Sequence, residues 1–317
     1  MLTRRKFLGT AAAAAGTLAA ASARGQQDPA RERRIALLAG PPSHSYGSHE
    51  HPGGCRLLAD RLGRIDGIAA RVLLDWPKDD KALDDIDALI VFGDGGTHHP
   101  LHGNFDALAP LARRGVGLGF LHYALIVDGD QPPRQLLDWI GGVYELNWSV
   151  NPIWTADIQE IPTHPITRGV APLSIEDEWY YHMRFRPEMQ GVTPLLSALP
   201  PKSSLARPDG PHSGNPHVRR AVVERKEPQH LAWCTEREDG GRGFGFTGLH
   251  WHWNFAHDGF RRFLLNACAW LARIEIPEGG VASERPTLDE LIETAGKPPA
   301  KWKRAAARER IERLTRS

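Results

Sequence analysis

Short apolar runs recur through the first half of the chain, and each ends at glycines or polar residues. These runs fall at residues 35–39, 72–74, 88–92 and 116–121. Uninterrupted runs of this length are typical of strands that are buried on both faces of a parallel sheet. Apolar residues at helical spacing lie between them, for example over 55–62 and 105–114. The alternation predicts an α/β fold, a parallel sheet with helices on both faces.

The second half of the chain departs from this alternation. Residues 143–235 are rich in tryptophan, proline and short strand-like runs, such as 179–181. This composition predicts β-hairpins and loops that elaborate one edge of the sheet. The alternation returns with a strand over 242–247, followed by a helix from Asp258, its expected N-cap, to Ala272.

The first 27 residues have the three-part pattern of a secretory signal peptide. A basic segment with the pair Arg4-Arg5 precedes an alanine-rich apolar stretch and the small residues 21–23. The paired arginines match the twin-arginine type of signal, which predicts a periplasmic or other extracytoplasmic location. That route carries folded proteins, often with a cofactor already bound. A membrane anchor is the alternative, but the apolar stretch is too short for a span of about 20 residues, so no membrane association is expected after cleavage.

Charge and cysteine content narrow the range of partners. The formal net charge of +1 gives no general basic field that would attract nucleic acid, so no nucleic-acid partner is expected. The basic residues of 301–316 are predicted to lie on a solvated helix. The 3 cysteines are far apart and lack CxxC spacing, which gives no disulfide framework. Two of them, Cys55 and Cys268, fall on apolar helical faces and are predicted to be core thiols.

Polar, histidine-rich segments follow four of the predicted strands. They are residues 43–51, 94–100, 122–123 and 248–254. Ligands of open α/β sheets bind outside the carboxyl ends of the strands. We therefore expect these four segments to meet at one edge of the sheet and to form the functional site.

The histidines of these segments are candidate metal ligands or acid/base groups. His250 and His252 would face the same side of a strand, because residues i and i+2 do so. Together with His122 they are candidate ligands of one divalent ion, Zn²⁺, Ni²⁺ or Mn²⁺. The alternative is a water-filled sugar pocket in which histidines only donate hydrogen bonds, and no HExxH spacing decides for the metal.

Tryptophan content adds a carbohydrate to the candidate ligands. The chain has 10 tryptophans, whose rings pack well against sugars but more often fill protein cores. Trp233 and Trp270 are predicted to be core residues. Trp179 and Trp251 lie next to polar motifs and are candidate walls of a sugar pocket.

Six motifs along the chain form a joint pattern. They are Ser43-His44-x-Tyr46-Gly47-x-His49-Glu50-His51, Asp94-Gly95-Gly96, Gly117-x-Gly119-x-Leu121-His122-Tyr123, His164-Pro165-Ile166-Thr167-Arg168-Gly169, Asp177-Glu178-Trp179-Tyr180 and Gly248-x-His250-x-His252-Trp253. Together they resemble the ThuA-like (trehalose utilisation) family of the class I glutamine amidotransferase-like superfamily. The resemblance covers residues 33–275 and implies a flavodoxin-like parallel sheet, here with β-rich insertions. Residues 276–317 lie outside it and are expected to form a helical tail. The resemblance also implies a role in the metabolism of trehalose, related disaccharides or 3-keto-sugars.

The chain departs from true amidotransferases of that superfamily at the catalytic turn. There, the turn after the Gly-x-Gly strand carries a nucleophilic cysteine, and a later strand end supplies its histidine base. Here the turn carries His122, and no cysteine occurs where it could serve. The chain is therefore not expected to be a glutamine amidotransferase.

Two functions remain open for the strand-end site. The first is a hydrolase or lyase acting on a disaccharide or keto-sugar, in which His122, His250 and Glu178 perform metal-assisted acid/base chemistry. The second is a sugar-binding module that turns nothing over. In both, the residues expected to contact the sugar are His44, Tyr46, His49, Asp94, Tyr123, Trp179 and Trp251. Residues 209–216 form either a lid over the same edge or an ordinary surface loop.

Overall fold

The centre of the protein is a seven-stranded sheet with the strand order β2-β1-β3-β4-β11-β10-β9. The computed structural model describes residues 31–316, and the chain from Glu32 on forms one compact unit. The first five strands in this order are parallel, whereas β10 pairs antiparallel with both β11 and β9. The strands are β1 (Arg33–Ala39), β2 (Ile68–Leu73), β3 (Ala88–Phe92), β4 (Gly117–Leu121), β9 (Val192–Ala198), β10 (Gln229–Glu236) and β11 (Arg242–Phe246).

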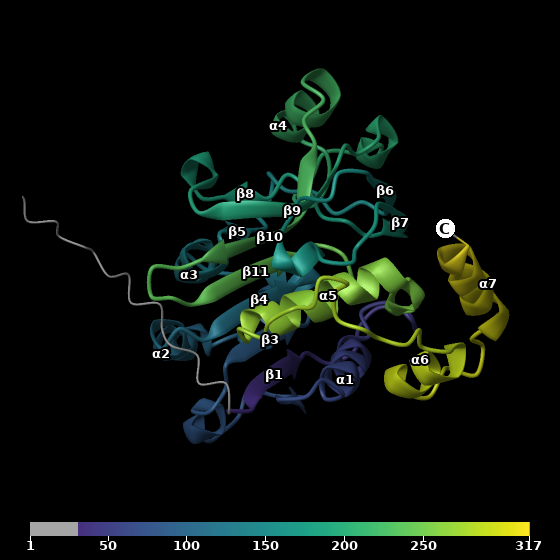
Figure 1. The fold of residues 1–317 in the computed structure, drawn as a ribbon. Coiled ribbons are helices and arrows are strands. Elements are labelled where there is room, and N and C mark those ends of the chain that lie inside the picture. Colours follow the sequence, from purple (N-terminus) through teal and green to yellow (C-terminus); the bar gives the residue numbers. More distant parts are fainter. Residues whose placement is uncertain (1–30, 317) are drawn as a thin grey trace, which may run out of the picture. The chain divides into compact units, whose positions relative to one another are not determined.

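Helices cover both faces of the sheet, which confirms the predicted α/β architecture (Figure 1). Successive residues of β1 show why the strand is an unbroken apolar run. Ile35 and Leu37 lie in one core cluster, whereas Ala36 and Leu38 lie in the other, because neighbouring side chains of a strand point to opposite faces. The first cluster is covered by α1 (His51–Leu62) and α5 (Asp258–Leu271), the second by α2 (Leu108–Arg113) and α3 (Gln131–Ile140).

The segment between α3 and β10 contains two small antiparallel sheets, which confirms the predicted β-rich insertion. The pairs are β5 (Gly142–Val143) with β8 (Arg184–Phe185), and β6 (Trp154–Ile158) with β7 (Leu173–Asp177). Residues of β6 and β7 alternate between buried and exposed, so one face of this pair packs on the core and the other is solvated. The short helix α4 (Pro216–Arg219) follows in the same insertion.

Local differences from the sequence predictions have identifiable causes. β2 begins at Ile68, earlier than expected, because this edge strand is mostly half-buried and lacks a long apolar run. Residues 179–181, expected as a strand, form a loop in which Tyr181 bridges to the backbone of Val150. The N-cap of α5 is His257 and not Asp258, since the His257 Nδ1 accepts the Phe260 N–H at 3.2 Å.

The C-terminal segment carries two helices, α6 (Leu288–Ala295) and α7 (Arg304–Thr315). α6 packs against α1, and α7 packs against the 3-10 helix His252–Ala256. The expected signal peptide lies outside the described residues. Among residues 31–316, no helix is long and apolar enough to cross a membrane.

Four parallel strands, β1, β3, β4 and β11, lie side by side at the centre of the sheet. Their carboxyl ends therefore meet at one edge. The histidine-rich segments expected there follow directly: 43–51 after β1, 94–100 after β3, His122 after β4 and 248–254 after β11. The sheet topology thus places all four segments at the same edge.

Candidate functional site

His122 lies at the sharp turn after β4, where it begins the 3-10 helix His122–Leu125. The residue is fully buried and has φ of 55°, a left-handed backbone conformation that costs a non-glycine residue about 1–2 kcal/mol. Its Nδ1 lies 2.8 Å from the Thr247 carbonyl oxygen. Because a carbonyl only accepts, Nδ1 carries the proton, and the Nε2 of the neutral ring presents a lone pair.

His49, in the loop after β1, is oriented in the same way by a hydrogen bond of its Nδ1. Its backbone is also left-handed, with φ of 51°, and its side chain is 1% exposed. The Nδ1 lies 3.0 Å from Oδ1 of Asp94, which follows β3, so a carboxylate fixes this proton too. Ser43 donates to the same Asp94 oxygen at 2.8 Å. The His49 Nε2 is thereby turned to within 3.2 Å of the His122 Nε2.

Glu178 and His250 complete the group. Glu178 follows the last residue of β7, and its Oε2 lies 3.4 Å from the His122 Nε2 and 3.9 Å from the His49 Nε2. The Nδ1 of His250, on the loop after β11, lies 3.2 Å from the same oxygen. The four ligand atoms lie within 4.8 Å of one another. We call His49, His122, Glu178 and His250 the His₃Glu cluster.

The contacts within the cluster call for a positive charge. With both rings neutral, His49 and His122 would turn lone pairs toward each other across 3.2 Å, beside the Glu178 carboxylate. Buried lone pairs and anions at such distances repel unless a cation lies between them. Either a proton on one imidazole or a metal ion supplies that charge.

The pKa directions follow from this geometry. Burial alone lowers the pKa of His49, but hydrogen bonds with Asp94 and Glu178 outweigh it and raise the pKa above its ordinary value. Burial raises the pKa of Glu178, but its contacts with the three histidines hold that pKa well below its usual range. Burial lowers the pKa of His122, which keeps this ring neutral. Glu178 is therefore a carboxylate, and the shared positive charge belongs nearest to His49 or to a metal.

The cluster fits a divalent metal ion. Ligand atoms about 2.1 Å from a tetrahedral Zn²⁺ are about 3.4 Å apart, and three of the separations within the cluster are 3.2, 3.4 and 3.2 Å. The His250 Nδ1 is buried and, although close to Glu178, has no hydrogen-bond partner among residues 31–316. An inward-facing nitrogen without a partner is expected of a ligand whose metal is the missing partner.

A second group of candidate ligand atoms, which includes the Asp94 carboxylate, borders the cluster. His44, His49 and Asp94 also bring ligand atoms within 4.8 Å of one another. His44 is exposed, and its ring centroid lies 3.8 Å from that of His49. Burial raises the pKa of Asp94, but hydrogen bonds from His49 and Ser43 outweigh this and lower it to about 2. Because the Asp94 oxygen already holds the His49 proton, its role is to orient that ring.

The structure brings together some of the predicted site residues and separates others. His122, His250 and Glu178 lie together as expected. His49, which was expected to contact a sugar, instead belongs to the same group of candidate ligand atoms. His252 does not: the chain turns into a 3-10 helix at this residue instead of continuing as a strand. Its Nε2 lies 3.1 Å from the Leu291 carbonyl oxygen. The prediction that His250 and His252 bind one ion is therefore wrong.

Trp179 and Tyr46 are held by hydrogen bonds to backbone carbonyls of the protein. Trp179 is 0% exposed, and its Nε1 donates to the Ile175 carbonyl at 3.0 Å, so the prediction that it walls a sugar pocket is wrong. The Tyr46 hydroxyl donates to the Gly296 carbonyl at 2.8 Å, so the C-terminal segment, rather than a ligand, engages it. Tyr123 and Trp251 are half-buried beside the cluster, with ring centroids 5.7 Å from His49 and 4.5 Å from His250 respectively.

Two tyrosines that the sequence did not single out form the outer wall. The Tyr180 ring stacks on His122 at 4.5 Å, and its hydroxyl lies 3.3 Å from the His122 Nε2. Tyr144 packs against Tyr180, and its hydroxyl lies 3.2 Å from the Nδ1 of His212. Residues 209–216 therefore reach the outer wall of the cluster through His212. The signal for Tyr180 was its place two residues after Glu178 in the motif Asp177-Glu178-Trp179-Tyr180, but aromatic residues usually fill cores.

The three thiols of the chain offer no nucleophile. Cys55, Cys234 and Cys268 are all buried. Burial raises the pKa of Cys234 and of Cys268 to about 12, and that of Cys55 further. A thiol is reactive only as the thiolate, so His122 stands at the turn after β4 without a cysteine to activate.

Comparison with known proteins identifies the family. Residues 44–271 match the profile of the ThuA family, described as trehalose utilisation. The chain belongs to the ThuA family. This ThuA-family chain resembles the solved structure of a ThuA-like protein from Bacteroides uniformis, with a TM-score of 0.53, 17% identity, and coverage of 78% of this chain and 94% of that one. An identity this low shows the fold alone.

Two further solved structures are similar at lower scores. A ThuA-like protein from Parabacteroides merdae gives a TM-score of 0.48 at 15% identity, covering 81% of this chain and 94% of that one. PurLQS from Thermotoga maritima gives 0.38 at 13% identity, covering 76% and 97%. None of the curated proteins matches the chain.

Proposed function

We propose that this ThuA-family chain is an exported, metal-dependent enzyme that acts on a disaccharide or keto-sugar. One observation carries the proposal: four separate parts of the chain bring candidate ligand atoms of the His₃Glu cluster to within 4.8 Å of one another. Burying three imidazoles in this way is costly for a site that only hydrogen-bonds a sugar, since each inward nitrogen then needs its own partner. The family's description as trehalose utilisation supports a carbohydrate substrate.

The chain's own residues would hold and orient the ion. When bound, a divalent ion acts as a Lewis acid on a carbonyl or hydroxyl oxygen, and mixed imidazole and carboxylate donors suit Zn²⁺, Ni²⁺ or Mn²⁺. Asp94 fixes the His49 ring, and the Thr247 carbonyl fixes the His122 ring, by accepting their Nδ1 protons at 3.0 and 2.8 Å. These contacts set the tautomer that leaves Nε2 free for the metal.

Glu178 is the residue best placed to move a proton. Its side chain is 15% exposed, against 1% for His49 and 0% for His122, so a substrate reaches it first. Its contacts with the histidines lower its pKa and keep it unprotonated, the form in which a carboxylate accepts a proton. The proton of that carbon, or of an attacking water, would pass to the carboxylate. His44, Tyr123 and Trp251 lie at the rim, where they would contact the sugar.

Elemental analysis of the purified chain tests the metal. We expect about one equivalent of Zn, Ni or Mn per chain, lost in His49→Ala and His122→Ala. His98→Ala, which removes an exposed histidine near the same strand end, is the matched control and should keep the metal. A wild-type chain that stays metal-free after incubation with each of these ions would contradict the proposal.

Turnover separates the enzyme from the sugar-binding module. The metal-loaded chain is incubated with trehalose and with 3-keto-disaccharides, and products are followed by mass spectrometry. We expect turnover in the wild type and its loss in Glu178→Gln, in which the three imidazoles of the cluster are still expected to hold the metal. Saturable sugar binding without any product would favour the non-catalytic module instead.

The export part of the proposal rests on the N-terminal twin-arginine pattern. Replacing Arg4-Arg5 by a pair of lysines is expected to keep the chain in the cytoplasm of the expressing bacterium. Cell fractionation measures this, with the unaltered chain as the control. An unaltered chain found only in the cytoplasm would contradict export without touching the metal proposal.

A further inference from the structure

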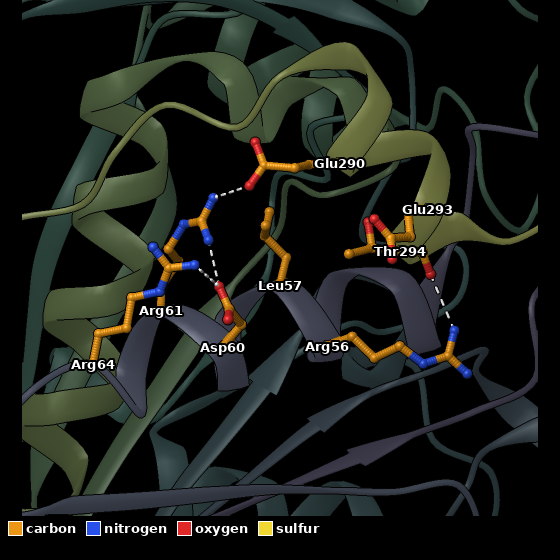
Figure 2. Close-up of a pocket in the computed structure, with 8 residues that line it drawn as sticks. All are labelled: Arg56, Leu57, Asp60, Arg61, Arg64, Glu290, Glu293 and Thr294. Carbon is orange, nitrogen blue, oxygen red and sulfur yellow. Dashed lines mark hydrogen bonds and ion pairs between the residues drawn. The ribbon is translucent and has the colours of Figure 1, made fainter.

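The C-terminal segment, which lies beyond the residues that match the ThuA family, is anchored on the side of α1. Figure 2 shows the groove between α1 and α6 in which this anchoring occurs. Arg61, whose side chain is 4% exposed, donates to Glu290 at 2.9 Å, and Arg56 donates to the Thr294 carbonyl at 3.0 Å. The arginines of the groove are paired within the chain, so the groove is a seam between helices.

From this seam the segment extends over the two loops that carry His49 and His250. Tyr46, three residues before His49, donates to the Gly296 carbonyl at 2.8 Å. Trp302 packs against Tyr46, with ring centroids 5.1 Å apart, and stacks on Trp253 at 5.8 Å. Both loops therefore have C-terminal residues as their outer neighbours.

Arg310 of α7 contacts residues that lie near Glu178 and His250 in the sequence. Its guanidinium donates to the Glu176 carboxylate and to the Glu176 carbonyl, each at 2.8 Å, and to Asn254 Oδ1 at 3.3 Å. It also lies over the Trp251 ring, 4.8 Å from the centroid. The Arg310 side chain is 12% exposed, whereas the Glu176 side chain is 50% exposed, so the guanidinium is held mostly inside the protein while the carboxylate remains open to water.

The two residues that Arg310 holds lie on either side of a buried carboxylate, Asp177. Asp177 is 0% exposed. Asn254 donates to it at 3.0 Å, and Glu176 precedes it in β7. It accepts the backbone N–H groups of Leu249, His250 and Trp251 at 2.8, 3.0 and 3.4 Å, and that of Glu178 at 2.8 Å. One carboxylate thus binds the backbones of two cluster residues.

This arrangement fixes a backbone that would not hold its shape alone. Leu249 has φ of 89°, which an L residue rarely adopts. The Asp177 carboxylate compensates by collecting three successive N–H groups, and charged acceptors make stronger hydrogen bonds than neutral ones. The direction of the His250 ring therefore depends on Asp177 staying in place.

We infer that Arg310 is a positioning residue of the His₃Glu cluster: it clamps Glu176 and Asn254 so that Asp177 holds Glu178 and His250 together. The inference rests on the proposed metal site, which it deepens. In this view the C-terminal helix α7 helps to hold the site in place, because the contacts of Arg310 are with residues near Glu178 and His250 in the sequence.

The first test measures positioning without metal. Hydrogen–deuterium exchange is followed in peptides spanning 173–180 and 247–256 of the metal-free chain. In Arg310→Ala we expect exchange of the amides of 249–251 to speed up by about tenfold, as expected when opening costs about 1.4 kcal/mol less. Arg313→Ala is the matched control on the same helix, since Arg313 is 61% exposed and pairs only locally with Glu309.

The second test measures the consequence for the metal. Co²⁺ is titrated into the wild type, Arg310→Ala, Arg310→Lys and Arg313→Ala, and its visible absorption reports both affinity and coordination geometry. We expect affinity in Arg310→Ala to fall about tenfold, the lower end of the range for outer-shell partners. Arg310→Lys should fall less, because it keeps the charge but not the forked contact with Glu176. Arg313→Ala should match the wild type.

The outcomes separate this inference from the proposed function. Unchanged exchange and unchanged Co²⁺ affinity in Arg310→Ala overturn the inference and leave the metal site standing. Equal losses in Arg310→Ala and Arg313→Ala overturn it too, since they show a general effect on α7. If exchange at 249–251 is faster in Arg310→Ala but the wild type binds no Co²⁺, the positioning contact is supported and the proposed metal site is contradicted.

Discussion

Gly248→Ala is expected to disturb both the stability of the fold and the position of His250. A Cβ at residue 248 would lie 2.6 Å from one carbon of the Trp179 ring and 2.9 Å from the next. Carbon atoms in contact are about 3.5–4.0 Å apart, so the overlap is about 1 Å. Trp179 cannot move away easily, because it is 0% exposed and packs against Phe246 and Phe260.

The expected loss of stability depends on which atoms can move to relieve this overlap. Overpacking in a tight core costs about 1–3 kcal/mol, and we expect about 2–3 kcal/mol here because the obstacle is a rigid ring. If the ring stays, the backbone of 248–250 must move, which carries the His250 Nδ1 away from its place 3.2 Å from Glu178. Misplacement by about 1 Å can cost about 100-fold in a functional site, so we expect at least a tenfold loss of metal affinity.

Urea unfolding of the metal-free chain measures the first effect and Co²⁺ titration the second. Gly279→Ala is the control, since a Cβ there has nothing within 4 Å. Trp179→Phe removes part of the obstructing ring. The double variant Gly248→Ala/Trp179→Phe should therefore lose less free energy of unfolding than the sum of the losses of the two single variants. Additive losses, or a Gly248→Ala chain as stable as the wild type, would refute the reasoning.

Two further predictions concern other histidines. Replacing His250 by glutamine should weaken Co²⁺ binding by more than about tenfold, whereas His252→Gln should lower stability and leave Co²⁺ affinity unchanged, because His252 bonds to the Leu291 carbonyl; titration of both variants checks this. Burial lowers the pKa of His99 to about 4, so as pH falls the unfolded chain takes up the proton first and stability is lost between pH 6.5 and 4. Over that window the free energy of unfolding of the wild type should drop by up to about 3 kcal/mol more than that of His99→Gln, as measured by urea titration at several pH values.

The sheet could be predicted from the sequence because its central strands are dry on both faces. β3 falls on residues 88–92, where the apolar run had placed it. β2 was placed less well, since an edge strand is only partly covered and a half-buried strand shows a weak apolar signal. The strand expected at 179–181 is absent for a different reason: these three large aromatics are buried although they belong to a loop, so burial alone did not indicate a strand.

The candidate site could be predicted only as far as strand ends determine it. His122 and His250 follow β4 and β11, and the parallel topology brings them to one edge. The loop after β1 carries three histidines, and sequence spacing does not tell which of His44, His49 and His51 turns inward. His44 and His49 both have a left-handed φ, so the choice is made by the Asp94 carboxylate, which follows a different strand and lies 3.0 Å from the His49 Nδ1.

The misplacement of His252 shows the same limit and explains the cluster. The i, i+2 rule holds only while a strand continues, and here the Asp177 carboxylate gathers three successive amides and turns the chain after β11. The turn that removes His252 from the site is also what aims His250 at Glu178. The cluster therefore takes only His250 from this segment, and His49, His122 and Glu178 come from three others. Its inward atoms, two imidazole nitrogens 3.2 Å apart and a carboxylate, need a positive charge among them, which a proton on one imidazole or a metal ion supplies.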